Sequence, residues 1–485
     1  MKFVGNIASD SEVVKTASGA IVAGKPVVVN ADGTVGSSST TISAGIGSEV
    51  TFESASARPQ HGTFDSNSNK VVVTYQDAGN SNYGTAIIGT IDDSDNSISF
   101  GTAVVFESAT VDGIAAVFDS SNNKVVISYR DGGNSYYGTS IVGTVSGTSI
   151  SFGTSATFWA NANMQSHISA SFDTNVNKVL ITFAKVGNDG VAIAGTVSGT
   201  DISFGSDVTF ETGQARFIST AFDNNSNTHV VVYTDHDNSQ YGTACVLSVA
   251  SNSTVTAQTP VVWESAETSA QDIAFDTTNN KFLIAFRQVG SSGRGTAIVG
   301  TVSGTSLSFG TKNDWNSVNT LDPRTAFNDA SGTFVILYDE SSGTDVKYIE
   351  ATISGTSVTF GTAAVADTDG STDYNDVIYD SNLKRTVLLY QDSGDSSHGK
   401  ARVLASAGTY SIATSENFIG FAKDAVADGA VATIQTANNI SRNQSSLTAG
   451  QTYFVQTDGT IGTTADSPSI TAGTAISATE LIVKG

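Results

Sequence analysis

The sequence predicts an all-β protein: a seven-bladed β-propeller with four antiparallel strands per blade, flanked by a small β-module at each end. Three observations support this prediction. A corner motif returns seven times at a nearly constant spacing, each repeat holds four short β-branched runs, and the two ends of the chain match each other. A period of about 50 residues with four strands is typical of a propeller blade.

The corner motif joins an aromatic residue to Asp or Asn, and its copies lie between 50 and 54 residues apart. The seven copies are Phe64-Asp65, Phe118-Asp119, Phe172-Asp173, Phe222-Asp223, Phe275-Asp276, Phe327-Asn328 and Tyr379-Asp380. We expect the acidic or amide side chain to accept backbone N–H bonds of the turn that follows. The Asn residues that end these turns suit a left-handed conformation, namely Asn69, Asn123, Asn177, Asn227 and Asn280. The motif is therefore a structural signal, in which the aromatic ring packs between blades.

The second repeat shows the four strands most clearly, over residues 111–118, 124–129, 139–145 and 149–153. Seven such units favour a closed ring over a β-solenoid, whose rungs are shorter, or a string of β-sandwiches, whose domains are longer. Two modes of ring closure remain open. Residues 409–413 could form the last outer strand, or residues 41–43 could join the final blade.

The two ends of the chain look like copies of one small β-module. Residues 23–36 match residues 449–462 without a gap, and both contain an Asp-Gly hairpin turn. Residues 3–5 resemble residues 418–420, and residues 41–45 resemble residues 469–473. We therefore predict an N-terminal module at 1–48, a propeller at 49–414 and a C-terminal module at 415–485, with the two modules able to pack together.

Composition excludes several function classes. The chain has 46 acidic and 23 basic residues and a formal charge of −23, which argues against nucleic acid and anionic lipid as partners. No run approaches the ~20 apolar residues of a membrane span, and the N-terminus lacks the apolar core of a signal peptide. We thus expect synthesis in the cytoplasm and no membrane insertion. Cys245 is the single cysteine, and the five histidines lack metal-ligand spacing, so we predict no disulfide, metal or cofactor.

The loop between the second and third strands is the best binding candidate. Its aromatic and acidic residues suit a sugar, through ring stacking and hydrogen bonds to hydroxyl groups. These candidates are Asp77, Tyr83, Asp131, Tyr137, Asp235 and Tyr241. The alternative is ordinary turn chemistry, with each Tyr covering the edge of the next blade.

A second candidate set would line the central channel. It stands three residues before each corner: His61, Ala115, Ser169, Ser219, Asp272, Arg324 and Asp376. The set could hold water or a cation, or it could form a polar plug. A glycan-degrading propeller would need a few unique carboxylates near the axis, and the acids that keep this alternative open are Asp112, Asp272, Asp322, Asp373 and Asp376.

Residues 418–422, 443–453 and 472–483 together resemble the terminal module of tail-fibre and other structural proteins of marine bacteriophages. The corner repeats resemble those found beside that module in the same virion proteins. The resemblance implies a non-enzymatic virion appendage that contacts other virion proteins, a host cell-surface glycan or a host protein, and that forms a homo-oligomer. It supplies no catalytic residues. The alternatives are a glycan-degrading enzyme on the virion and a bacterial surface filament or adhesin subunit.

Overall fold

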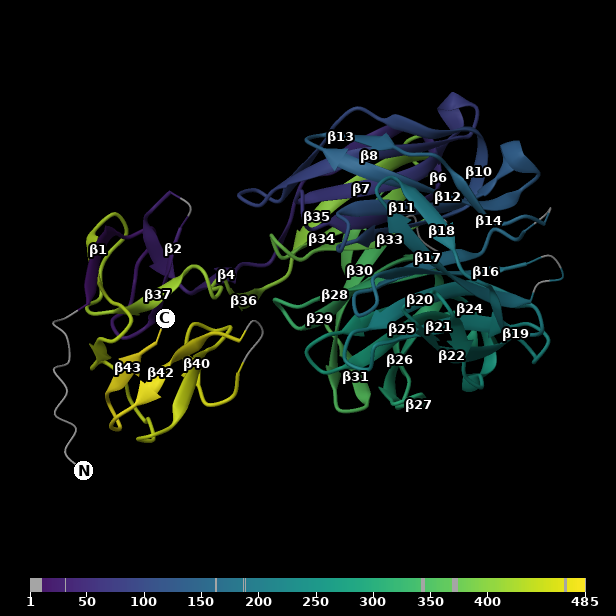
Figure 1. Cartoon of the computed structure of the whole chain (residues 1–485). Coiled ribbons are helices and arrows are strands. Elements are labelled where there is room, and N and C mark those ends of the chain that lie inside the picture. The colour runs from purple at the N-terminus through teal and green to yellow at the C-terminus, as the bar shows by residue number, and fades with distance from the viewer. Residues whose placement is uncertain are drawn as a thin grey trace. The chain divides into compact units, whose positions relative to one another are not determined.

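The computed structural model describes residues 11–30, 32–161, 164–185, 187, 189–341, 345–368, 374–465 and 469–484 (Figure 1). The chain divides into two compact units. One unit consists of Met1–Ser43 with Ala407–Gly485, and the other is Ala44–Ser406. The second unit begins and ends a few residues before the predicted boundaries at 49 and 414. None of the helices in the described part of the chain has the length and apolar character that a membrane-spanning helix needs.

The unit Ala44–Ser406 is a seven-bladed β-propeller whose blades are four-stranded and antiparallel. The strands of each blade are given from the inner to the outer one. Blade 1 has β6 (Val50–Asp65), β7 (Lys70–Asp77), β8 (Tyr83–Asp92) and β9 (Ser97–Phe100), and blade 2 has β10 (Val104–Asp119), β11 (Lys124–Asp131), β12 (Tyr137–Ser146) and β13 (Ser149–Phe152). Blade 3 has β15 (Ile168–Asp173), β16 (Lys178–Ala184), β17 (Gly190–Ser198) and β18 (Asp201–Phe204), and blade 4 has β20 (Ala215–Asp223), β21 (Thr228–Asp235), β22 (Tyr241–Val249) and β23 (Val255–Ala257). Blade 5 has β24 (Val261–Asp276), β25 (Lys281–Gln288), β26 (Arg294–Ser303) and β27 (Ser306–Phe309); blade 6 has β28 (Asn313–Asn328), β29 (Thr333–Glu340), β30 (Val346–Ser354) and β31 (Ser357–Phe360); and blade 7 has β33 (Asp376–Asp380), β34 (Arg385–Asp392), β35 (His398–Ala405) and β5 (Gly45–Ile46).

The inner strands form a closed circle, in which β6, β10, β15, β20, β24, β28 and β33 each contact the next and β33 contacts β6. Strand β5 closes the ring, because Gly45 and Ile46 pair with Ala405 and Leu404 of β35. The N-terminal side thus supplies the last outer strand, a few residues later than the 41–43 alternative. Residues 408–411 form β36 (Gly408–Ser411), which instead pairs with β4 (Ser39–Ile42) outside the propeller.

The corner prediction is confirmed in all seven blades. In blade 2, Asp119 Oδ1 accepts the N–H groups of Ser121 and Asn122 at 3.0 and 3.1 Å. The other six corner side chains, Asn328 among them, accept the same two N–H bonds of their own turns. The five Asn residues that end the turns have φ between 52° and 58°. Burial of the aromatic rings between blades completes the corner, as for Phe64, which packs in a cluster shared by blades 1 and 7.

A second repeated joint links neighbouring blades. The start of each long strand pairs with the third strand of the preceding blade before crossing to the axis; where the strand is broken, the same pairing is made by β14 (Ala156–Trp159), β19 (Val208–Glu211) and β32 (Ala364–Asp367). In three of these joints a Glu accepts a hydrogen bond from the buried Tyr 22 residues later, as Glu53 does from Tyr75 at 3.0 Å. The joint thus gives a fully buried Tyr an acceptor for its hydroxyl in a half-buried Glu.

The unit formed by the two chain ends contains two sheets with one topology. The first sheet has the order β1 (Glu12–Thr16), β38 (Val431–Gln435), β37 (Phe418–Ala422), β2 (Pro26–Val29) and β3 (Val35–Ser37); the second has the order β39 (Ile440–Ser441), β43 (Leu481–Val483), β42 (Thr471–Ala475), β40 (Thr452–Val455) and β41 (Ile461–Gly462). If the strands of each sheet are counted in chain order, both sheets place them in the order first, fifth, fourth, second, third. Both sheets also slip register beside a glycine of the fourth strand, Gly420 in one and Gly473 in the other.

The propeller is therefore inserted between the third and fourth strands of the first module. Residues 418–435, which were expected in the C-terminal module, complete the N-terminal sheet instead. The matched segments 23–36 and 449–462 occupy equivalent hairpins. The second matched pair differs in structure, because residues 469–473 lead into β42 whereas residues 41–45 run from β4 to β5. The echo at residues 3–5 lies outside the described residues. The two modules share a core, since Val28, Phe418 and Phe421 pack with Tyr453 and Leu481.

Candidate functional site

The predicted loop residues lie in three separate turns. Asp77, Asp131 and Asp235 end the second strands of blades 1, 2 and 4, and each pairs across its loop with Tyr83, Tyr137 or Tyr241. The carboxylates accept backbone N–H bonds from the loop, as Asp131 does from Gly133 and Asn134 at 2.9 and 3.1 Å. Burial raises the pKa of Asp131 and Asp235. These side chains shape their own turns and form no single cluster.

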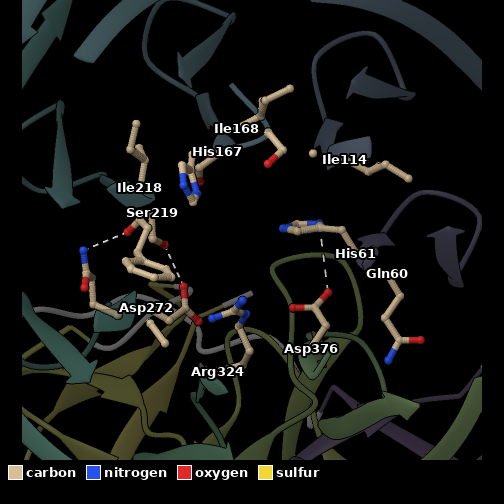
Figure 2. A pocket seen from close by; sticks show the side chains of 16 residues that line it. Gln60, His61, Ile114, His167, Ile168, Ile218, Ser219, Asp272, Arg324 and Asp376 are labelled. Atoms are coloured by element: carbon tan, nitrogen blue, oxygen red, sulfur yellow. Dashed lines mark hydrogen bonds and ion pairs between the residues drawn. The ribbon is translucent and has the colours of Figure 1, made fainter. Parts of the chain in front are cut away.

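The channel prediction finds a cavity. Its volume is about 170 Å³, and six of the seven predicted channel residues line it: His61, Ser169, Ser219, Asp272, Arg324 and Asp376. In blade 2 the lining comes from Gly113 and Ile114, whereas Ala115 is buried. Figure 2 shows the guanidinium of Arg324 between the carboxylates of Asp272 and Asp376, with His61 and His167 further along the wall.

Several channel side chains serve the adjacent blade. The inner strands of neighbouring blades are in contact but are not paired by backbone hydrogen bonds. The N–H groups that face the neighbouring blade therefore need other acceptors. Four side chains supply them: Asp376 accepts Gly62 N–H at 2.6 Å, His61 Nδ1 accepts Ala116 N–H at 3.3 Å, Ser169 Oγ accepts Thr220 N–H at 3.1 Å, and Asp272 Oδ2 accepts Thr325 N–H at 2.8 Å. Each bond runs to the next blade, one position past the equivalent channel residue.

Charges in the cavity balance incompletely. Burial raises the pKa of Asp376, an effect that the nearby His61 and the Gly62 N–H oppose. Burial works against the charge of Arg324, but the carboxylates of Asp322, Asp272 and Asp376 outweigh it and raise its pKa. The closest of these, Asp322, lies 2.6 Å from Arg324. Burial and the charge of Arg216 lower the pKa of His167 to about 4, so its imidazole is neutral at pH 7.

The inner strands carry a two-residue bulge just before the channel residue in blades 2, 4, 5 and 6. The first residue of each bulge has positive φ: Gly113 at 53°, Phe217 at 48°, Ala270 at 49° and Asp322 at 39°. Gly adopts this conformation without strain and Asp tolerates it, whereas Phe and Ala are strained there. Phe217 is 38% exposed, lines the cavity and contacts the ring of His167 with 5.4 Å between centroids.

Phe217, His167 and Gln271 were missed as candidates. A comparison of the repeats places Phe217 at the position of Gly113, two residues before the channel residue, and this substitution was the available signal. Among the acids named for the enzyme alternative, Asp272 and Asp376 line the cavity, Asp322 pairs with Arg324, and Asp112 pairs with Arg130 at 2.7 Å. Asp373 lies outside the described residues.

One group of carboxylates could hold a metal by geometry. Single oxygens of Glu49, Asp367 and Asp392 lie within 4.8 Å of one another. The ammonium of Lys400 stands 3.1 Å from Glu49 and 4.0 Å from Asp392, and 2.6 Å from Asp395. A protein cation already pairs with two of these three carboxylates, which is consistent with a structural role in blade 7.

No family model matches the chain, and no curated protein matches it. Among solved structures, a protein from Lactobacillus plantarum aligns with a TM-score of 0.47 at 9% identity, over 72% of this chain and 95% of that one. A periplasmic gluconolactonase of Pseudomonas aeruginosa aligns with a TM-score of 0.47 at 11% identity, over 64% and 87%. The AofleA protein of Arthrobotrys oligospora aligns with a TM-score of 0.41 at 7% identity, over 67% and 88%.

Proposed function

We propose that the chain is a non-enzymatic virion appendage protein, a tail-fibre or decoration component that displays its propeller for adhesion to a host surface. The observation that carries this proposal is the insertion of the whole propeller into one of two tandem copies of a small β-module. In this architecture the propeller would be the displayed domain, and the unit Met1–Ser43 with Ala407–Gly485, here called the base, would attach it to the virion. The resemblance of the modules to terminal modules of marine bacteriophage structural proteins supports the same role.

The base is suited to docking on other virion proteins or to forming a homo-oligomer. Its first module leaves the edge strand β1 exposed along residues 13–16, and Val14 and the neighbouring Val431 are 60% and 66% exposed. Thr16 pairs with Val431, so the two exposed valines lie on adjacent strands. Exposed, β-branched edge strands are common sites of pairing with another chain.

A glycan-degrading enzyme is the second candidate, because Asp272, Asp376 and Arg324 converge on the cavity. The bonds that these carboxylates accept from the next blade favour a structural role for both acids. Release of reducing ends from host polysaccharide would support the enzyme, and it should disappear in Asp376→Asn if that acid reacts.

The gene neighbourhood gives the first test: genes for tail or capsid proteins should flank this one, whereas pilus or surface-filament genes would favour a bacterial adhesin. The second test uses the full chain. Labelled protein should bind to cells of the host, or to its purified envelope polysaccharide, without shortening the polymer. Failure to bind any envelope preparation would reject the adhesive role and leave the structural one.

A further inference from the structure

We propose that the cavity at the channel binds a single ring of an uncharged sugar, with Phe217 as the stacking surface. This inference rests on the proposed adhesive function and assigns it to a site. The sequence pointed to the loop tyrosines instead, but the structure engages those loops in their own turns. Three features of the cavity carry the proposal: an exposed ring held in an unfavourable backbone conformation, a buried amide that fixes it there, and the chemistry of the lining.

Phe217 occupies a position where a bulky side chain is unfavourable on two counts. Its φ of 48° lies in the left-handed region, which a bulky residue rarely adopts, and 38% of its surface is exposed to water. The equivalent positions hold Gly113, Ala270 and Asp322, so the fold does not require a ring here. Strain of this kind persists where the surrounding structure enforces it, and it gathers at binding sites.

The side chain of Gln271 enforces the conformation. This residue is 2% exposed, and its Nε2 donates to the carbonyl oxygens of Phe217 at 2.8 Å and Arg216 at 3.3 Å. Its Oε1 accepts from Thr234 Oγ1 at 3.1 Å. Blade 5 therefore fixes the bulge of blade 4, and the ring of Phe217 is presented at the cavity by a preorganised backbone.

The lining defines the class of ligand. Carboxylates of Asp272 and Asp376 and the guanidinium of Arg324 offer acceptors and donors beside an aromatic face, a combination that suits hydroxyl groups on an apolar ring. A carboxylate has about four lone-pair sites. Asp376 accepts one backbone N–H, and Asp272 accepts one backbone N–H and the hydroxyl of Ser219 at 2.6 Å, so sites remain on both acids. Two acids against one base, within a chain of charge −23, disfavour an acidic sugar.

The volume limits the size of the ligand. About 170 Å³ is below the range of roughly 300–1,000 Å³ for pockets that bury a drug-sized ligand. The cavity therefore accommodates one terminal ring, and the rest of a polysaccharide would extend outward.

The exposed Tyr136 gives a matched contrast. It also has positive φ, 60°, and is 38% exposed, but the guanidinium of Arg130 lies 4.1 Å from its ring centroid. Arg130 is in turn fixed by Asp112 at 2.7 Å. The face of Tyr136 thus already holds a cation, whereas the ring of Phe217 meets the ring of His167 at a tilt of 54°, which leaves Phe217 the better stacking surface.

The experiment titrates the full chain with methyl glycosides of glucose, galactose and mannose by calorimetry, and with glucuronate as the charged probe. Wild type should bind at least one neutral glycoside and bind glucuronate more weakly. Phe217→Gly should weaken that binding at least tenfold while raising the unfolding temperature, because it removes the ring and the strain together. Phe217→Trp should keep binding and report it by fluorescence.

Two controls separate the ring from the backbone. Ser292→Gly relieves a positive φ of 65° in blade 5 at a residue that does not line the cavity, and it should raise the unfolding temperature without changing affinity. Tyr136→Asn installs the residue that blade 1 carries as Asn82 and should leave affinity unchanged.

Wild-type affinity in Phe217→Gly, stronger binding of glucuronate, or no binding of any neutral glycoside would each overturn the proposed site. The outcome is distinct from failure of the adhesive function. If Phe217→Gly still adheres to host envelopes like wild type, adhesion stands and the site is elsewhere; if wild type binds glycosides but no envelope, the site stands and adhesion fails.

Discussion

Replacement of the corner acid in blade 2 tests the structural interpretation of the repeated motif. Asp119 is 1% exposed and accepts four hydrogen bonds: two from the backbone of Ser121 and Asn122, and two from their side chains at 2.6 and 2.8 Å. In Asp119→Ala all four are lost. The donors sit in an exposed turn, where water replaces the lost partner, so we count the net value of the two backbone bonds, about 0.5–1.5 kcal/mol each. We expect a loss of about 2 kcal/mol.

Asp119→Asn is the matched variant. Its Oδ1 can still accept both backbone N–H bonds, as Asn328 does in blade 6 at 3.0 and 3.3 Å. The loss should therefore stay below about 1 kcal/mol. Sugar binding should not change in either variant, because Asp119 does not line the cavity and lies five residues beyond Ile114, the last residue of β10 that does.

Calorimetric unfolding of the full chain measures both variants. A loss of 1 kcal/mol shifts the midpoint by about 2–4 °C in a domain of 150–250 residues and by less in a larger one, so Asp119→Ala should fall by a few degrees. Equal losses for Asn and Ala would show that the carboxylate charge, and not the turn geometry, stabilises the corner. No loss in Ala would refute the structural reasoning altogether.

Three further predictions concern buried polar groups. Tyr233→Phe removes a 2.9 Å bond to Glu211 and should cost about 1–3 kcal/mol by chemical denaturation, whereas an unchanged midpoint would show that Glu211 finds another donor. Lys400→Met leaves several carboxylates without their cation and should cost about 3 kcal/mol at pH 7 by chemical denaturation, whereas an unchanged midpoint would contradict this account. The pKa of His167 is about 4 in the folded chain against an ordinary value of 6.5, so the unfolded chain takes up the proton first. Stability from this residue is complete above pH 6.5 and is lost as the pH falls towards 4, and His167→Gln should flatten the melting temperature across that window.

The sequence was most informative for local structures that recur in all seven repeats, because the seven copies can be compared with one another. The corner involves residues at most four positions apart, and comparison of the copies was enough to predict both the Asp bonds and the left-handed Asn residues. The same counting placed His61, Asp272 and Asp376 at the channel. Residues in regular strands keep their register from blade to blade, so a fixed offset from the corner finds the same place in each.

The bulge at Phe217 could not be predicted in the same way. In blades 2, 4, 5 and 6 two residues of the inner strand oppose one residue of the second strand, so one extra residue enters without any change in composition, and the positive φ is visible only in the structure. The pairing of strands could not be predicted either, because the residues of a strand such as 418–422 do not indicate which segment of the chain pairs with it. The sequence therefore left open how the ring closes, and it wrongly assigned this strand to the C-terminal module, whereas the strand belongs to the N-terminal sheet.

The insertion of the propeller into a module has a consequence for damage by proteases. The chain enters the propeller unit after Ser43 and leaves it after Ser406, so two stretches of chain join the propeller to the unit formed by the two modules. A single cut in either crossing leaves the other intact. Strand β5 remains paired to β35 after a cut before Ala44, and blade 7 stays closed. Shedding of the propeller requires two cleavages, whereas a domain attached at one end is released by one.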